Sequence, residues 1–142
     1  MSLLKISDLA ELNISELRFI AWDTETTGTS TSKDYLVEIA GLTFDEDYEL
    51  RSFETLIQPP CVIPENVIKI HGITNEMVKN SPPTDIALLD FFEFLSLSGA
   101  PRLLVAHNAQ FDVSMVTSEL ARLHKKAELQ SFKSEIVIDS CR

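Results

Sequence analysis

Two acidic residues, Asp23 and Glu25, directly follow an apolar run in the stretch FIAWDTETTG, residues 19–28. On a β-strand, side chains at positions i and i+2 point to the same face, so both carboxylates face one place. Like charges repel there unless a positive charge lies between them, and hard divalent cations prefer carboxylate oxygens. The motif therefore predicts a metal site at the end of this strand. Taken alone, it is more typical of a strand that ends in a solvent-exposed acidic turn.

A third carboxylate, Asp112, lies in the stretch VAHNAQFD, where a short apolar strand is followed by a helix. Asn108 suits the N-cap of that helix, and an anion at Asp112 would then be favoured by the helix dipole. On a helical wheel, Asp112 lies near the centre of the apolar arc of 109–124, where a carboxylate is costly unless it is paired or metal-bound. Glu119 falls in the same arc. Asp112 is therefore also explained as the partner of a lysine or arginine, or as part of a frayed helix start.

The elements that must position these carboxylates alternate between strands and helices. The predicted strands are 19–23, 35–44, 49–57, 102–106 and 135–139. The acidic turn DEDY joins the second and third strands into a hairpin, and the proline-rich loop QPPCVIPENV follows them. The predicted helices are a short one after the glycine of HGITNEMV, a well-buried one with Thr84 or Asp85 as N-cap, and one over 109–124. This order predicts an α/β fold with a mixed sheet.

Composition and charge narrow the class of protein. The chain has 142 residues, of which 44% are hydrophobic, which is typical of one globular domain. A net charge of −10 argues against a broad nucleic-acid groove, but it is compatible with an enzyme that grips only a strand end through metal ions. The two cysteines, Cys61 and Cys141, show no metal-ligand spacing, and no secretory or membrane-length apolar run is present. We expect a reducing, cytoplasmic location and no membrane contact.

The three carboxylates come together if two of the predicted strands are parallel neighbours. Sites in open α/β sheets form at the carboxyl ends of strands. Asp23 and Glu25 follow the first strand, and Asp112 follows the strand at 102–106. Three converging carboxylates suggest two cations, an arrangement that cleaves phosphodiesters by activating water and stabilising the leaving oxygen.

The stretches DTETTG, EIAGLTF, IHGITNEMV and LLVAHNAQFD, in this order and spacing, resemble the DEDD 3′–5′ exonuclease family. Within it they resemble the proofreading (epsilon) subunits of bacterial DNA polymerase III and other DEDDh members. The resemblance covers about residues 19–140 and implies a ribonuclease-H-like fold with a five-stranded mixed sheet of order 3-2-1-4-5, in which only strand two is antiparallel. It divides the chain into a lead-in over 1–18 and an exonuclease domain over 19–142 that lacks the C-terminal helices of relatives.

Carried over position by position, the resemblance implies the site residues. Asp23, Glu25 and Asp112 match the catalytic ligands of a two-metal site for Mg²⁺ or Mn²⁺. Thr26 and Thr27 match a substrate-binding turn whose backbone lies against the terminal nucleotide.

The resemblance also bears on the three histidines. His71, in IHGIT, corresponds to a residue that contacts the nucleotide in relatives; the alternative is a loop histidine that supports a turn. His107 and Asn108 are expected to shape the loop before the helix rather than to do chemistry. His124 is expected to belong to a solvent-exposed charge cluster over 122–126.

A third family motif, a histidine general base followed by a fourth aspartate ligand, is not matched. The last strand leads into VIDSCR, where Asp139 fits the strand position rather than the fourth ligand, and no histidine follows His124. Whether the base is histidine or tyrosine is open. One hypothesis is a metal-dependent 3′–5′ exonuclease that acts on single-stranded 3′ ends of DNA or RNA, with a DNA polymerase subunit as a candidate partner. The other is a truncated, non-catalytic module that binds metal, nucleic acid or a protein.

The last strand also predicts self-association. Its apolar residues point to both faces, and in relatives the C-terminal helices supply part of their cover. Contiguous apolar surface and an open strand edge tend to recruit another chain, so we expect copies of this chain to associate through it.

Overall fold

A five-stranded mixed sheet forms the centre of the computed structural model, which describes residues 13, 15, 17–44, 50–99 and 101–141. Its strands are β1 (Arg18–Thr26), β2 (Leu36–Phe44), β3 (Ser52–Leu56), β4 (Arg102–Ala106) and β5 (Val137–Asp139). The order across the sheet is β3-β2-β1-β4-β5. Strand β2 is antiparallel to β1 and β3, whereas β4 is parallel to β1 and β5 is parallel to β4. The predicted α/β fold and strand order are confirmed.

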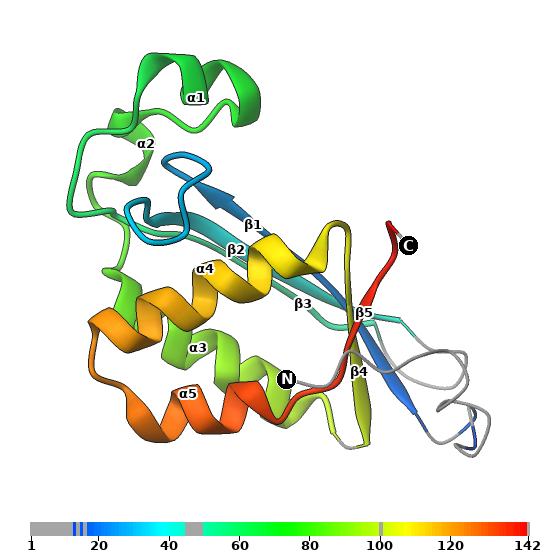
Figure 1. Ribbon diagram of the computed structural model, residues 1–142. Helices are drawn as coiled ribbons and strands as arrows, with labels where there is room; N and C mark the ends of the chain where they lie inside the picture. The colour runs from blue at the N-terminus through cyan, green and yellow to red at the C-terminus, as the bar shows by residue number, and fades with distance from the viewer. Residues whose placement is uncertain (1–12, 14, 16, 45–49, 100, 142) are drawn as a thin grey trace.

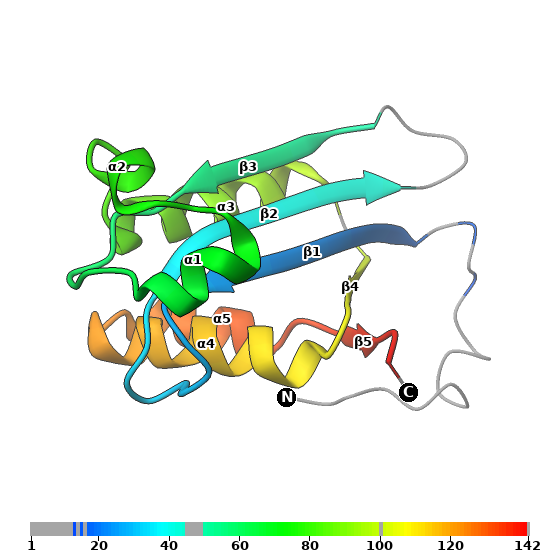
Figure 2. The same cartoon turned by 90° about the horizontal axis from the view of Figure 1, so that it is seen from above.

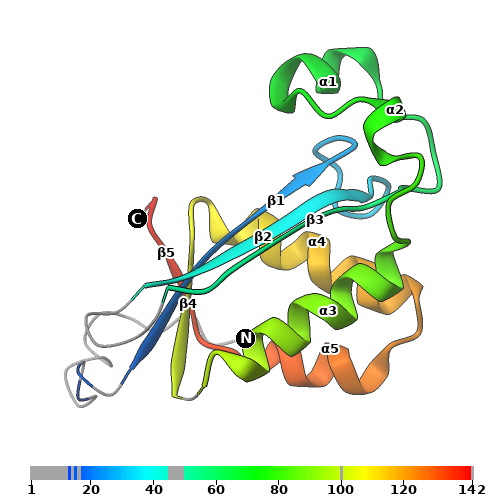
Figure 3. The same cartoon turned by 180° about the vertical axis from the view of Figure 1, so that it is seen from behind.

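Three helices cover one face of this sheet, and two short helices lie beyond the end of β1 (Figures 1 and 2). The helices are α1 (Glu65–His71), α2 (Asn75–Val78), α3 (Thr84–Leu97), α4 (Ala109–Arg122) and α5 (Lys126–Lys133). Seen from behind, α1 and α2 stand apart from the layer formed by α3, α4 and α5 (Figure 3). None of the helices in the described part of the chain is long and apolar enough to cross a membrane.

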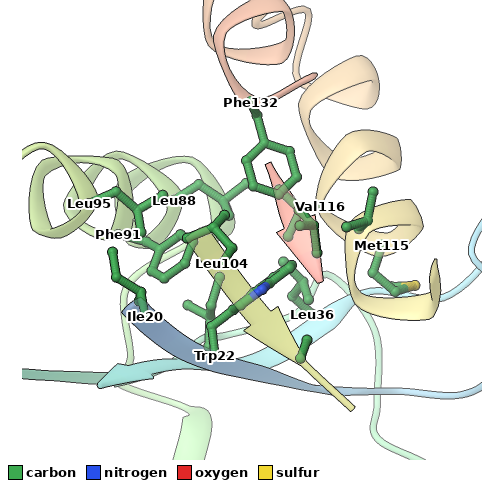
Figure 4. Close-up of a cluster of buried hydrophobic side chains, with 14 of the residues drawn as sticks. Ile20, Trp22, Leu36, Leu88, Phe91, Leu95, Leu104, Met115, Val116 and Phe132 are labelled. Atoms are coloured by element: carbon green, nitrogen blue, oxygen red, sulfur yellow. The ribbon is translucent and has the colours of Figure 1, made fainter. Parts of the chain in front are cut away.

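The main core lies between the sheet and the three covering helices. Ile20 and Trp22 alternate with outward-facing residues along β1, and both are buried. The Trp22 ring lies 5.9 Å from the ring of Phe91 on α3 and 5.9 Å from that of Phe132 on α5 (Figure 4). Each such side chain contributes about 1.5–3 kcal/mol by its removal from water. This packing fixes the face that β1 turns away from the helices.

A smaller cluster supports α1 and α2. Val37 of β2 packs there with Ile63, Ile73 and Val78, all of them buried. Helix α1 itself buries none of its seven residues and ends at Gly72, whose φ of 78° suits a residue without a Cβ. Val67 and Ile68 of α1 are only partly buried, but they pack against this cluster, so one side of the helix is held there.

Several local predictions were wrong. The proline-rich loop ends at Pro64, where α1 begins, and α5 was not predicted at all. The N-cap of α3 is Pro83, which is extended, so Thr84 and Asp85 lie in the first turn without a side-chain cap bond. Helix α3 is also less buried than expected, because only one side packs on the sheet. Its outer side leaves three apolar residues exposed: Ile86 45%, Leu89 40% and Leu97 58%.

Two further predictions fall outside the described residues. They are the turn DEDY and most of the lead-in over 1–18. The antiparallel pairing of β2 with β3 confirms the predicted hairpin itself.

Candidate active site

The end of β1 carries the first two candidate carboxylates on the face that the helices leave open. Burial alternates along this end of the strand. Thr24 and Thr26 are buried and face the helices, whereas Asp23 is exposed and Glu25 is half-buried on the opposite face. Glu25 pairs across the strands with Glu38 of β2. As predicted, Asp23 and Glu25 therefore lie on one face of the strand.

Asp112 reaches the same strand from the first turn of α4. Its side chain is 2% exposed, and its Oδ1 accepts hydrogen bonds from the backbone nitrogen of Thr24 at 3.1 Å and from Thr24 Oγ1 at 2.6 Å. Strands β1 and β4 are parallel neighbours, as the predicted convergence requires. Asp112 thus binds the residue that lies between Asp23 and Glu25.

The charge of Asp23 disfavours the ionisation of the other two carboxyl groups. Burial raises the pKa of Asp112 to about 6, the Thr24 hydroxyl opposes the rise, and the charge of Asp23 adds to it. The pKa of Glu25 is raised by burial and then by the charge of Asp23. Although Asp23 is exposed as a residue, partial burial of its carboxyl group raises the pKa of Asp23 as well. A divalent cation among them would relieve this repulsion.

The donor set fits Mg²⁺ or Mn²⁺ by its chemistry, because these cations prefer carboxylate oxygens. Within the described ranges, no three His, Cys, Asp or Glu side chains already stand in a metal-binding arrangement. A cation would therefore have to draw Asp23, Glu25 and Asp112 closer together. The metal site stays a prediction.

The turn after β1 is braced from within. Thr26 Oγ1 donates to the carbonyl of Gly28 at 2.6 Å, and Thr27 Oγ1 donates to Asp34 Oδ1 at 3.0 Å. The backbone nitrogen of Tyr35 donates to Thr27 Oγ1 at 3.0 Å. A Cβ at Gly28 would lie 2.5 Å from an oxygen of Asp34, so a larger residue would push this carboxylate away from Thr27 and Ser30. The turn is well fixed beside Glu25; its contact with a nucleotide stays a prediction.

His71 connects α1 to this turn. Its Nδ1 accepts from the backbone nitrogen of Ile73 at 3.0 Å, so Nε2 carries the hydrogen and donates to the carbonyl of Thr26 at 3.2 Å. The positive charge of His71, when protonated, would lower the pKa of Glu25. The structure therefore shows the turn-supporting role, and a nucleotide contact stays a prediction.

The loop between β4 and α4 contains a residue with a positive φ, Asn108. Asn108 is the N-cap, as predicted, but it is left-handed (φ 59°, ψ 47°) and makes no side-chain cap bond. The ring of His107 lies with Nε2 3.1 Å from Cys141 Sγ. A protonated His107 would also lower the pKa of Asp23, so this loop borders the acidic residues.

The sequence analysis missed one acidic neighbour, Glu38. Burial raises the pKa of Glu38 to about 7, and the hydrogen-bonded carboxyl group of Glu54 and the charges of Glu25 and Asp23 add to the rise. The signal was present in EIAGLTF, because the alternation of the predicted hairpin places Glu38 on the open face. What the sequence did not provide was the register that sets Glu38 opposite Glu25.

The far end of α4 holds a second buried acid, Glu119, which is partnered within the chain. Its Oε1 accepts from the backbone nitrogen of Leu36 at 3.0 Å and lies 3.2 Å from Arg122. Arg122 also donates to the carbonyl of Asp34 at 2.7 Å and lies 4.3 Å above the ring of Tyr35. The prediction of a wholly solvent-exposed charge cluster was therefore wrong for Arg122.

The fold and the acidic residues at the end of β1 are together those expected of a DEDD-type nuclease. A family model described as exonuclease (RNase_T) matches residues 20–142, so this chain belongs to that exonuclease family, and the resemblance to DEDD exonucleases is confirmed.

Curated relatives agree with this assignment. The DNA polymerase III subunit epsilon of Treponema pallidum is 41% identical over 108 residues, which are 76% of this chain and 48% of the relative. The PolC-type DNA polymerase III of Caldanaerobacter subterraneus is 38% identical over 108 residues, 76% of this chain and 7% of the relative. A putative bifunctional exonuclease/endonuclease of Mycobacterium tuberculosis is 36% identical over 118 residues, 79% of this chain and 18% of the relative. The chain thus spans half or less of the length of these relatives.

Solved structures support the fold. The cell-death related nuclease CRN-4 superposes with a TM-score of 0.62 at 16% identity, covering 72% of this chain and 39% of that protein. Exonuclease I of E. coli in complex with an oligonucleotide superposes with a TM-score of 0.62 at 18% identity, covering 74% of this chain and 24% of that protein.

Proposed function

We propose that this chain is the exonuclease domain of a metal-dependent enzyme that removes nucleotides from single-stranded 3′ ends. The observation that carries the proposal is the position of three carboxylates around the end of β1. Asp23 and Glu25 share the open face of the strand, and Asp112 binds Thr24 between them. A hollow on the same face borders Asp23 and would leave room there for a substrate; its lining includes Ala21, Asp23, Ala40, Leu42 and Glu54.

Each residue of the site has a defined task in this proposal. Asp23, Glu25 and Asp112 hold Mg²⁺ or Mn²⁺, which when bound would activate water and stabilise the leaving oxygen. Thr24 orients Asp112 by its two donated hydrogen bonds. The turn at Thr26–Thr27 receives the terminal nucleotide along its backbone.

Single-stranded DNA is the proposed substrate class. Two relatives are named as DNA polymerase III proteins, and exonuclease I of E. coli was solved with DNA oligonucleotides, in one case with a zinc ion bound. A DNA polymerase subunit is the proposed partner, and a cytoplasmic location belongs to the same proposal. RNA hydrolysis is an outcome that the assay below distinguishes. Self-association through β5 stays a prediction that light scattering would test.

The test is a nuclease assay with a 5′-labelled single-stranded oligonucleotide and Mn²⁺. We expect a ladder of products shortened from the 3′ end, which a phosphorothioate linkage at that end stops. Asp23→Asn should lower the rate by more than about 100-fold, because even the loss of an outer partner of a ligand costs about 10–100-fold. Glu65→Gln, on the exposed side of α1, is the matched loss of one negative charge and should leave the rate unchanged.

Three results separate the alternatives. Hydrolysis of an RNA oligonucleotide in place of DNA would reassign the substrate. Hydrolysis that persists in chelator would overturn the metal-dependent mechanism. Protein that binds Mn²⁺ but leaves both oligonucleotides intact would favour the non-catalytic module.

A further inference from the structure

Asp139, at the end of β5, binds the loop that leads into α4. Its Oδ1 accepts from the backbone nitrogen of Asn108 at 3.1 Å and from the backbone nitrogen of Cys141 at 2.9 Å. One carboxylate oxygen therefore joins the chain after β5 to the N-cap of α4. By the family resemblance, Asp139 fits the position at the end of the last strand rather than that of the fourth metal ligand.

Ser140 binds the same loop at Ala106, two residues before Asn108. Its backbone nitrogen donates to the carbonyl of Ala106 at 2.9 Å, and its Oγ contacts the same oxygen at 3.3 Å. Asp139 and Ser140, which we call the β5 clasp, thus hold the loop on both sides of His107. The clasp continues the parallel pairing of β4 with β5, which includes Ala106 with Asp139.

The start of α4 gains support from outside the loop, because no side chain caps it. Asn108 has φ 59°, a left-handed conformation that asparagine tolerates better than most residues with a Cβ, but its side chain makes no cap bond to the helix. Asp112 lies four residues further on, in the first turn. A change in this loop would therefore rotate or shift the helix start and with it the Asp112 carboxylate.

We propose that Asp139 is a positioning residue for the metal site: by fixing the Asn108 nitrogen, it holds the start of α4 so that Asp112 faces β1. This inference rests on the proposed function, in which Asp112 is a metal ligand. Asp139 acts through Asn108 and α4 and needs no contact with the metal ion or the substrate.

The other end of the same strand pair offers a matched control. There Arg102 Nε donates to Glu135 Oε2 at 3.1 Å, and Arg102 also pairs with Glu135 Oε1 at 2.5 Å. Glu135→Ala removes a carboxylate that connects β4 with the segment before β5. Asp139→Ala removes a carboxylate that connects the ends of the same two strands. A role of Asp139 in sheet stability alone predicts the same behaviour for both variants.

The test compares Asp139→Ala, Asp139→Asn and Glu135→Ala in the full chain. Thermal melts over a series of Mn²⁺ concentrations give the concentration at half-maximal stabilisation, and hydrogen exchange in chelator reports on the amides of residues 108–113. We expect both alanine variants to melt earlier than the parent. Only Asp139→Ala should raise the Mn²⁺ midpoint, by about 10-fold or more, and speed exchange over 108–113. Asp139→Asn retains an oxygen that accepts both hydrogen bonds and should restore both readouts.

Each other result decides against a specific part of the inference. Equal Mn²⁺ midpoints in Asp139→Ala and Glu135→Ala would overturn the positioning role. Equal exchange over 108–113 in these two variants would overturn the clasp itself. A parent chain that is not stabilised by Mn²⁺ would overturn the proposed metal site and with it the role of Asp139 there, whereas the exchange data would still judge the clasp separately.

Discussion

Helix α4 buries one carboxylate near each end, and the two are partnered in different ways. Asp112 is 2% exposed and Glu119 is 3% exposed. Glu119 meets a backbone nitrogen of β2 and the guanidinium of Arg122. Asp112 accepts from Thr24 and from its own backbone nitrogen, and the ion pairs among the described residues do not include it.

The difference shows that burial alone does not identify a functional acid. Burial raises the pKa of Glu119, but the Leu36 nitrogen and Arg122 oppose the rise. The pKa of Asp112 rises to about 6, and Asp23 adds to the effect of burial where Glu119 has a cation. An acid with its own cation is a structural partner. An acid that faces another acid is stabilised when a cation comes from outside the chain.

The largest effect on the free energy of unfolding is expected at Glu119, near the C-terminal end of α4. Glu119→Ala leaves the Leu36 nitrogen and Arg122 without their acceptor, and breaking such a buried pair costs about 3 kcal/mol. For a domain of this size that is a fall in Tm of about 10 °C. Because Glu119 is outside the metal site, the Mn²⁺ midpoint should not change. A loss below about 1 kcal/mol would show that the two ends of α4 do not differ as described.

Asp112→Asn is expected to act in the opposite sense. The amide oxygen can still accept from Thr24, and the variant removes a charge that is disfavoured by burial and by Asp23. In chelator at pH 8 the free energy of unfolding of the variant should be about 1 kcal/mol higher than that of the parent, and no lower. One pKa unit corresponds to about 1.4 kcal/mol. Stabilisation by Mn²⁺ should disappear. Destabilisation of several kcal/mol in chelator would make Asp112 a structural partner like Glu119.

Glu38 extends the comparison, because it too is an acid that faces acids. Its folded pKa of about 7 lies above the ordinary value of 4.5, so the folded state binds more protons than the unfolded state between these pH values. The stability that Glu38 contributes is present below pH 4.5 and is lost as the pH rises through about 7. Asp112 acts in the same direction, from 3.8 through about 6.

The corresponding prediction is a pH-dependent one. In chelator the parent should lose stability between pH 5 and pH 8, and Glu38→Gln should reduce that loss. Denaturant unfolding across this range measures it, with Glu93→Gln on the exposed side of α3 as the control for a simple change of charge. An unchanged pH slope in Glu38→Gln would remove Glu38 from the group of mutually repelling acids.

The sheet and the shared face of Asp23 and Glu25 could be predicted from the sequence for a physical reason. A buried strand such as β1 and an alternating one such as β2 leave strong patterns, and i, i+2 spacing determines the shared face of Asp23 and Glu25. Helices α1 and α5 leave weak patterns, because α1 buries no residue and α5 buries only Phe132. The backbone partners of the two acids were beyond prediction, because only the fold brings the Leu36 nitrogen to Glu119 and the Thr24 nitrogen to Asp112. The pairing of Glu119 with Arg122, three residues apart on one helix, was available from helical spacing and was missed.

The smallest expected effect concerns the backbone just past the C-terminal end of α4. His124 is exposed and left-handed (φ 56°), and the nitrogens of His124 and Lys125 donate to the carbonyls of Ala121 and Leu120 at 3.1 and 2.9 Å. This is the Schellman pattern, whose left-handed position glycine favours.

His124→Gly removes the strain of a Cβ in this conformation, about 1–2 kcal/mol. The greater freedom of glycine in the unfolded chain offsets part of that gain, about 0.5–1 kcal/mol. We therefore expect a stabilisation of about 0.5 kcal/mol and an unchanged Mn²⁺ midpoint, while His124→Ala should retain the strain. A shift of the Mn²⁺ midpoint in His124→Gly would show that the two ends of α4 are coupled. Asp112 and Glu119 would then not be independent of each other.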